Sequence, residues 1–288
     1  MTTPPAEAPG PRVIYARPAL LAERSTSYCP GCGHGVVHRL IAEVLGELDL
    51  GPRTIAVAPV GCAVFAYDYL NLDFVEAPHG RAPAVGTGIR RVRPDAFVLT
   101  YQGDGDLASI GTAEIVHAAA RGERITAVFV NNGVYGMTGG QMAPTTLVGQ
   151  KTTSTPTGRD PAFHGNPIPM TEMLAVLPGV AYAARGSIAD AASIGRTKSY
   201  LKKACQVQLA GAGFAIVEVL SNCPVGWGMT PVESMEWLTD HVTPIYPLGV
   251  IADRTGPTRA VASGRTDPAP APTAAAPTDP APAPTAGG

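Results

Sequence analysis

The chain has 288 residues, of which 45% are hydrophobic and 15% are charged, and its formal net charge is −2. This length and composition fit one large α/β domain, alone or with small extensions. The near-neutral charge and the absence of a dense Lys/Arg run argue against nucleic-acid binding. The first ten residues lack the basic start and apolar run of a signal peptide, and no apolar stretch reaches the roughly 18 residues that a membrane span needs. We therefore expect a cytoplasmic protein that does not associate with membranes.

The two ends of the chain differ in composition from its middle. The sequence TDPAPAPT at 266–273 recurs at 278–285, and this Pro/Ala/Thr-rich tail has little to bury. Three parts are therefore predicted: a flexible N-terminus over residues 1–12, a folded domain over 13–255 and a disordered tail over 256–288.

In chain order, the middle alternates segments with helical and strand character. Amphipathic or capped segments predict helices over about 36–48, 107–121 and 188–209, and one that starts at Pro231 behind a capping box. Short apolar runs predict strands over about 54–60, 96–101, 125–130 and 214–220. This alternation predicts an α/β fold, with a mostly parallel sheet and helices on both of its faces.

Four predicted strands are each followed by a polar or thiol side chain. These side chains are Cys62, Asp104, Asn132 and Cys223. In parallel sheets, ligands bind beyond the carboxyl ends of the strands. The sequence therefore predicts one composite site, built where these four strands end.

Gly103-Asp104-Gly105-Asp106 and Asn132 have the residue types of a magnesium–diphosphate clamp. Magnesium prefers hard oxygen ligands, which the Asp104 carboxylate and the Asn132 amide supply. The two residues are 132 − 104 = 28 positions apart, enough for one helix and one strand. The glycines allow backbone N–H groups to approach a diphosphate, and the following helix directs its positive end toward it. Taken alone, Gly-Asp-Gly-Asp is often an ordinary turn, and its strand–turn–helix–strand context favours the clamp.

Cys29 and Cys32 form a C-x-x-C pair, which suits zinc, a redox dithiol or an iron–sulfur cluster. No thioredoxin-like unit surrounds the pair, whereas zinc stays open if two more thiols join it. Cys62 and Cys223 stand at strand ends, where thiolates can point at a shared centre, although either one alone also fits a buried core thiol. Cys205 lies within a predicted helix and is expected to pack as a small hydrophobe.

Taken together, these motifs resemble the beta subunit of 2-oxoacid:ferredoxin oxidoreductases, in particular the short 2-oxoglutarate and branched-chain types. The resemblance is carried by the clamp, by CPGCGH at 29–34, by HGR at 79–81 and by VYGMTGGQ at 134–141. It spans about residues 28–250. It implies a thiamine diphosphate-binding fold and coenzyme A-dependent oxidative decarboxylation of a 2-oxo acid, with electrons passed to a ferredoxin.

The resemblance also implies roles for particular residues. Magnesium would be bound by Asp104, Asn132 and the Val134 carbonyl, and one 4Fe–4S cluster by Cys29, Cys32, Cys62 and Cys223. Contacts to thiamine diphosphate are expected from Gly103, Asp104, Gly105, Asp106, Asn132, Cys62, and from Tyr135 and Thr138 of the glycine-rich loop. His34 is expected beside the cluster without binding it, and Trp227 is expected to cover hydrophobic surface.

His79 and Arg81 are the candidate catalytic residues. A guanidinium matches the geometry of a substrate carboxylate, so either side chain is expected near the cofactor or the substrate. The alternative is a loop histidine bonded to backbone and an arginine at the surface.

In the family, the glutamate that activates the cofactor's aminopyrimidine comes from an alpha-type subunit, so this chain alone is expected to be inactive. Two alternatives stay open. One is a subunit of a non-oxidative thiamine diphosphate-dependent decarboxylase or synthase, in which the cysteines are accidental. The other is a non-catalytic iron–sulfur or zinc subunit, in which Gly103–Asp106 is an ordinary turn.

Overall fold

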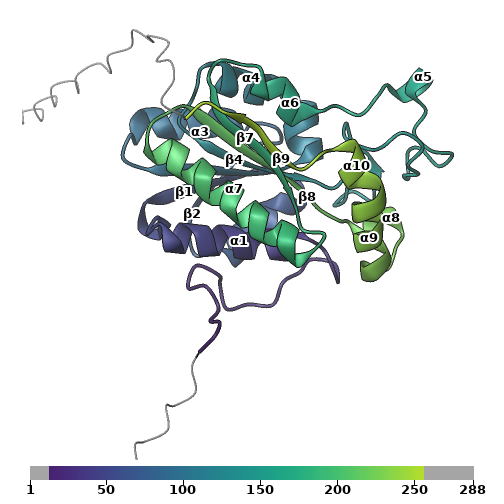
Figure 1. The fold of residues 1–288 in the computed structure, drawn as a ribbon, viewed down its shortest axis with the longest axis horizontal. Helices are drawn as coiled ribbons and strands as arrows, with labels where there is room; N and C mark the ends of the chain where they lie inside the picture. Colours follow the sequence, from purple (N-terminus) through teal and green to yellow (C-terminus); the bar gives the residue numbers. More distant parts are fainter. Residues whose placement is uncertain (1–12, 256–288) are drawn as a thin grey trace, which may run out of the picture. The chain divides into compact units, whose positions relative to one another are not determined.

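The computed structural model describes residues 13–255; the predicted flexible N-terminus and Pro/Ala/Thr tail lie outside the described residues, so both stay predictions. A seven-stranded sheet with the order β2-β1-β3-β4-β8-β7-β9 forms the centre (Figure 1). Its strands are β1 (Thr54–Ala58), β2 (Asp73–Glu76), β3 (Phe97–Gly103), β4 (Thr126–Asn131), β7 (Val180–Ser187), β8 (Phe214–Leu220) and β9 (Gly249–Asp253). Neighbouring strands run parallel, except that β9 pairs antiparallel with β7. The predicted α/β fold is confirmed.

Helices cover both faces of this sheet. The larger ones are α1 (His34–Glu47), α3 (Ala82–Val92), α4 (Thr112–Ala120), α6 (Met170–Ala175), α7 (Ala191–Leu209) and α9 (Pro231–Trp237). The shorter ones are α2 (Ala66–Tyr69), α5 (Pro161–His164), α8 (Pro224–Trp227) and α10 (Thr243–Ile245). Helices α1 and α7 pack on one face, while α4 and α6 pack on the other. Within the described residues, no helix combines the length and apolar character needed to cross a membrane.

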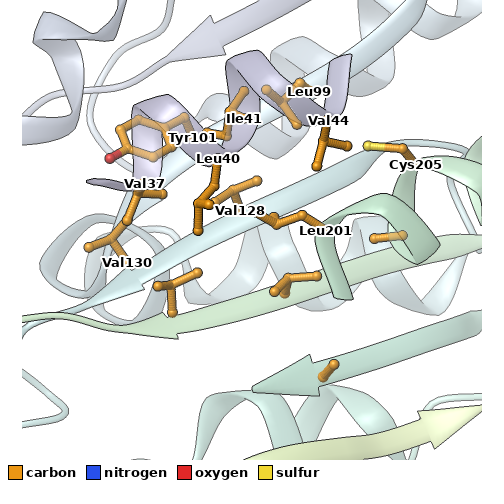
Figure 2. Packing of buried hydrophobic residues seen from close by; sticks show 14 of the residues in the cluster. Val37, Leu40, Ile41, Val44, Leu99, Tyr101, Val128, Val130, Leu201 and Cys205 are labelled. Atoms are coloured by element: carbon orange, nitrogen blue, oxygen red, sulfur yellow. The ribbon is translucent and has the colours of Figure 1, made fainter. Parts of the chain in front are cut away.

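The central strands are buried on both faces, because successive side chains point in opposite directions. In β3, Leu99 and Tyr101 join the core under α1 and α7, whereas Val98 joins the core under α4 and α6. Figure 2 shows Leu40 and Ile41 of α1 directed at the first of these cores. Cys205 lies in the same core with 3% of its surface exposed, as predicted.

The predicted strands over 54–60, 96–101, 125–130 and 214–220 correspond to β1, β3, β4 and β8. The capping box is present: the Thr230 hydroxyl accepts from the Glu233 N–H, and the Glu233 carboxylate accepts from the Thr230 N–H. The helix predicted over 107–121 is divided, because a π-helical turn (Asp106–Ile110) precedes α4. The strands β2, β7 and β9 were not predicted from the sequence.

A buried ion network explains how β7 tolerates an arginine. The Arg185 side chain, with 0% of its surface exposed, contacts Glu218 of β8 at 2.8 Å and Glu172 of α6 at 2.5 Å. The Glu218 carboxylate also accepts hydrogen bonds from Asn131 and Thr171. The network therefore ties β7 and β8 to the end of β4.

We expect Glu218→Ala to lower the free energy of unfolding by about 3–5 kcal/mol, because it leaves a buried guanidinium without its buried partner. Glu172→Ala is the matched control: its carboxylate contacts the same arginine but is 40% exposed, and its loss is expected to cost about 1 kcal/mol or less. Chemical denaturation of both variants measures the difference. Equal losses for the two would contradict the network described here.

Candidate cofactor site

The four side chains that follow strands lie along one edge of the sheet. Cys62 follows β1, Asp104 follows β3, Asn132 follows β4 and Cys223 follows β8, and these strands are consecutive neighbours in the sheet. At a strand spacing of about 4.8 Å, the four ends span roughly 14 Å. The predicted convergence of these strand ends is therefore present.

A cavity of about 130 Å³ opens at this edge. Its lining includes ten of the predicted site residues: Cys62, His79, Gly103, Asp104, Gly105, Asp106, Asn132, Val134, Tyr135 and Thr138. His34, Val60, Gly61, Ala63, Gly136 and Met137 complete the wall. Arg81, Cys29, Cys32 and Cys223 are not part of this lining.

The Asp104 carboxylate joins two strand ends and a distant loop. Its Oδ2 atom accepts from the Gly133 N–H at 2.6 Å and the Thr145 hydroxyl at 2.7 Å, and its Oδ1 atom accepts from the Gly105 N–H at 2.8 Å. Burial raises the pKa of Asp104 to about 6, although these hydrogen bonds favour its ionised form. Among residues 13–255, Oδ1 has a single donor, so it keeps a lone pair for a cation.

Asn132 is held through both its backbone and its side chain. Its Oδ1 atom accepts from the Val134 N–H at 3.2 Å, and its backbone carbonyl accepts from the Trp227 indole N–H at 2.9 Å. Asn132, Asp104 and Val134 thus line one cavity. Their hard oxygen donors fit a magnesium ion.

The glycines beside Asp104 have different surroundings. A Cβ atom on Gly103 would have nothing within 4 Å, so this backbone is open to the cavity. A Cβ atom on Gly105 would lie 2.2 Å from the Tyr135 ring, so Tyr135 packs directly on the start of the helix. Gly103 therefore fits the predicted close approach of a ligand, and Gly105 allows the glycine-rich loop to close down.

Asp106 has protein donors at both of its oxygens. Its carboxylate accepts from His79 Nδ1 at 2.5 Å, from the Gly80 N–H at 2.6 Å and from Gln102 Nε2 at 2.6 Å. This arrangement fixes the His79 ring at the cavity wall. The geometry favours Asp106 as an anchor for the His79 loop over a direct contact with an anionic diphosphate.

Arg81 is not among the residues that line the cavity. Its guanidinium pairs with Glu114 at 2.7 Å and donates to the Ile110 carbonyl at 3.0 Å. These contacts tie the His79 loop to the π-helical turn and α4. The predicted contact between Arg81 and substrate stays a prediction, whereas His79 lines the cavity as expected.

The four candidate cluster cysteines are free thiols near one another. A Cβ atom on Gly136 would lie 3.3 Å from Cys223 Sγ and 3.5 Å from Cys62 Sγ, which places the two sulfurs at most 3.3 + 3.5 = 6.8 Å apart. Burial, together with the nearby Cys32 and Cys29 thiols, raises the pKa of Cys62 to about 11. Within residues 13–255, however, no three His, Cys, Asp or Glu side chains converge as a metal site. The shared cluster stays a prediction.

An aromatic wall separates these cysteines from the core. The Tyr28 ring stacks on His34 with centroids 4.9 Å apart, and its hydroxyl donates to the Cys62 carbonyl at 3.0 Å. His34 Nδ1 is hydrogen-bonded to the Tyr101 hydroxyl at 2.5 Å. Burial lowers the pKa of His34 to about 4, so this imidazole is neutral at pH 7.

Four side chains make contacts in this region that were not predicted from the sequence: Thr145, Gln102, Trp227 and Asn222. Thr145 is 41 residues from Asp104 in the chain, and no motif marks it. Trp227 was expected only to cover hydrophobic surface, whereas its indole N–H holds the Asn132 carbonyl. The Gly-Trp-Gly setting of Trp227, shortly after Cys223, was the available signal.

Comparison with known proteins gives concordant results. Residues 59–219 match the family described as thiamine pyrophosphate enzyme, C-terminal TPP binding domain. The chain is 46% identical over 254 residues to the ketoisovalerate oxidoreductase subunit VorA of Methanothermobacter thermautotrophicus, covering 88% of this chain and 53% of that protein. It is 38% identical over 202 residues to the 2-oxoglutarate synthase subunit KorB of Methanocaldococcus jannaschii, covering 70% of each.

A solved structure is also similar. The chain matches the 2-oxoglutarate:ferredoxin oxidoreductase from Magnetococcus marinus, a structure with 2-oxoglutarate, coenzyme A and succinyl-CoA bound, with a TM-score of 0.67 and 26% identity. The match covers 83% of this chain and 85% of that chain. Against the VorA proteins, in contrast, this chain spans about half of the relative's length.

The raised pKa of Asp104 predicts a pH dependence. A carboxylate binds a cation only when ionised, so magnesium-dependent thiamine diphosphate affinity should be full at pH 7.5. It should fall about tenfold per pH unit below pH 6, the pKa of Asp104. Fluorescence titration between pH 5 and 8 measures this.

Asp104→Asn is the control for that titration, because the ligand's own protonation affects both proteins equally. The ratio of wild-type to variant affinity should approach one as the pH falls. A ratio that is constant over the whole range would exclude Asp104 as a cation ligand.

Proposed function

Because the chain belongs to the family of 2-oxoacid:ferredoxin oxidoreductase beta subunits and contains the thiamine pyrophosphate-binding domain, we propose that it is the cofactor-binding subunit of such an enzyme. The proposed reaction is coenzyme A-dependent oxidative decarboxylation of a 2-oxo acid, with ferredoxin as electron acceptor. The observation that carries this proposal is the shared cavity, which Asp104, Asn132 and Cys62 all line.

Magnesium and the diphosphate of thiamine diphosphate are proposed to bind at Asp104, Asn132 and the Val134 carbonyl, with Gly103 giving backbone access. When bound, the thiazolium ring supplies an electron sink for loss of CO2 from the 2-oxo acid. Gly133 and Thr145 hold the Asp104 carboxylate in place. Tyr135 and Thr138, on the loop over the cavity, would keep water from the cofactor.

His79 is the proposed contact to the substrate or cofactor. Its Nδ1 atom donates to Asp106, so Nε2 is the ring nitrogen left for the cavity. Asp106 thereby selects the tautomer and the orientation of His79. In this tautomer Nε2 is an acceptor, so it does not bind a carboxylate. Because no arginine is among the described residues that line the cavity, the substrate carboxylate is proposed to be bound by groups outside this lining, namely the predicted Arg81 and the partner subunit.

Cys29, Cys32, Cys62 and Cys223 are the proposed ligands of a 4Fe–4S cluster. Iron is bound by thiolates, not by thiols. Burial raises the pKa of Cys223 to about 12, so this side chain is a thiol at pH 7 and would lose its proton when the cluster is assembled. The cluster would accept electrons singly from the cofactor and pass them to a ferredoxin. Cys62 and Cys223 both lie close to Gly136 of the glycine-rich loop. This position supports a cluster-binding role over the alternative in which the cysteines have no function.

An alpha-type subunit is proposed to complete the site. Among the described residues that line the cavity, only Asp104 and Asp106 carry carboxylates. Asp104 is the proposed magnesium ligand, and Asp106 is engaged by His79, Gly80 and Gln102. The carboxylate that activates the aminopyrimidine is therefore proposed to come from another chain.

Reconstitution tests the proposed function. Viologen reduction that depends on a 2-oxo acid and coenzyme A should be absent for this chain alone and restored by its partner subunits, under anaerobic conditions. Branched-chain 2-oxo acids and 2-oxoglutarate are the substrates to compare. Turnover by the isolated chain, giving aldehyde without an electron acceptor, would instead indicate a non-oxidative decarboxylase.

Single Cys→Ser variants test the cluster. Replacing Cys29, Cys32, Cys62 or Cys223 should remove most of the bound iron and the brown absorbance, because each supplies one ligand. Cys205→Ser is the control, since this thiol is packed in the core. Full iron retention in Cys223→Ser would remove Cys223 from the set, and zinc without iron would exclude electron transfer.

A further inference from the structure

The segment Asn222–Trp227 lies between the two proposed cofactor sites. It begins where β8 ends, contains Cys223 and forms the short helix α8. Its first and last residues both make side-chain hydrogen bonds to backbone carbonyls of other segments. Those two carbonyls belong to the two sites that the proposed function requires.

The Trp227 end holds the magnesium clamp. Its indole N–H donates at 2.9 Å to the carbonyl of Asn132, which is 95 residues away in the chain. The clamp loop also packs on this helix, because a Cβ atom on Gly226 would lie 3.0 Å from the Val134 side chain. A Cβ atom on Gly140 would lie 2.9 Å from the Gly226 carbonyl. No larger residue fits at either glycine without a shift of the loop.

The Asn222 end holds the C-x-x-C turn. Its Nδ2 atom donates at 3.0 Å to the Gly31 carbonyl, 191 residues away, and at 2.8 Å to the Ser234 hydroxyl. Gly31 packs on the start of α9, since a Cβ atom there would lie 2.5 Å from Pro231. Asn222 is buried, with 1% of its surface exposed. The turn that carries Cys29 and Cys32 is therefore fixed beside Cys223.

From these contacts we infer that Asn222–Trp227 sets the position of the clamp relative to the cysteines. Trp227 is a positioning residue for Asn132, and Asn222 is a positioning residue for the C-x-x-C turn. The inference rests on the proposed function for the identity of the two cofactors. It adds that one six-residue segment, which contains Cys223, determines how the two cofactor sites are placed.

The chain has two tryptophans, and they provide a matched pair of variants. Trp227→Phe keeps the aromatic packing and removes the N–H donor to Asn132. Trp237→Phe is the control, because the Trp237 indole N–H has no hydrogen-bond partner in the described structure and its ring lies on His241.

In the full-length chain, Trp227→Phe should raise the dissociation constant of magnesium–thiamine diphosphate by roughly two- to tenfold, the effect of one lost hydrogen bond. Trp237→Phe should leave it unchanged. At equal iron content, Trp227→Phe should also alter the electron paramagnetic resonance spectrum of the reduced cluster. A purely structural role would lower thermal stability without changing that spectrum.

A second measurement does not depend on the folding of Trp227→Phe. In Trp237→Phe, Trp227 is the sole tryptophan, so adding magnesium–thiamine diphosphate should change its fluorescence. At the other end, Asn222→Ala should lower iron retention. Asn71→Ala should not: the exposed Asn71 amide also donates to a backbone carbonyl, that of Ala19 at 3.1 Å, but neither residue lines the cavity.

Unchanged affinity for magnesium–thiamine diphosphate in a folded Trp227→Phe variant would overturn the inference. So would a Trp227 fluorescence that does not change when magnesium–thiamine diphosphate is added. Equal loss of iron in Asn222→Ala and Asn71→Ala would overturn the inference that Asn222 positions the C-x-x-C turn. If the wild-type chain binds no magnesium–thiamine diphosphate, the proposed function fails. If the wild-type chain binds it and Trp227→Phe binds it equally well, only the inference fails.

Discussion

Three hydrogen bonds to the Asp104 carboxylate hold two strand ends and a distant loop in one place. Removing a buried carboxylate from water is unfavourable unless donors or a cation replace the lost solvation. The Gly105 and Gly133 N–H groups and the Thr145 hydroxyl replace part of it, and the raised pKa of Asp104 shows that the compensation is incomplete. A divalent cation in the cavity would supply the remainder, so on the proposed cofactor assignment the carboxylate that joins these segments is also the cation ligand.

The parallel sheet explains why the other groups are close to this carboxylate. Because β1, β3, β4 and β8 are consecutive neighbours, residues from distant parts of the sequence emerge at one edge within a few strand spacings. The Asp106–His79 contact and the segment Asn222–Trp227 then fix the loops that the strands deliver there. Strands set the coarse positions, and side-chain hydrogen bonds to backbone set the fine ones.

This division also accounts for what could be predicted from the sequence. The strands β3, β4 and β8 are largely apolar, and Asp104 and Asn132 follow β3 and β4 in a local motif, so these strands and these two residues were predicted. In contrast, β7 contains Arg185, and its burial depends on Glu218 of another strand. Thr145 and Trp227 contribute through contacts made over 41 and 95 residues of chain. No local pattern records such pairings, because they exist only once the fold has brought the segments together.

The incompletely compensated Asp104 charge has a consequence for the amount of protein that a cell maintains. A ligand that binds only the folded chain stabilises it by about 2.7 kcal/mol when present at one hundred times its dissociation constant. For a marginally stable domain, a change of that size lowers the unfolded fraction that proteases attack about one-hundredfold, and changes of about 1–2 kcal/mol already alter cellular abundance several-fold. On the proposed cofactor assignment, thiamine supply would then govern the lifetime of this chain, so that vitamin-starved cells would lose the polypeptide as well as its activity.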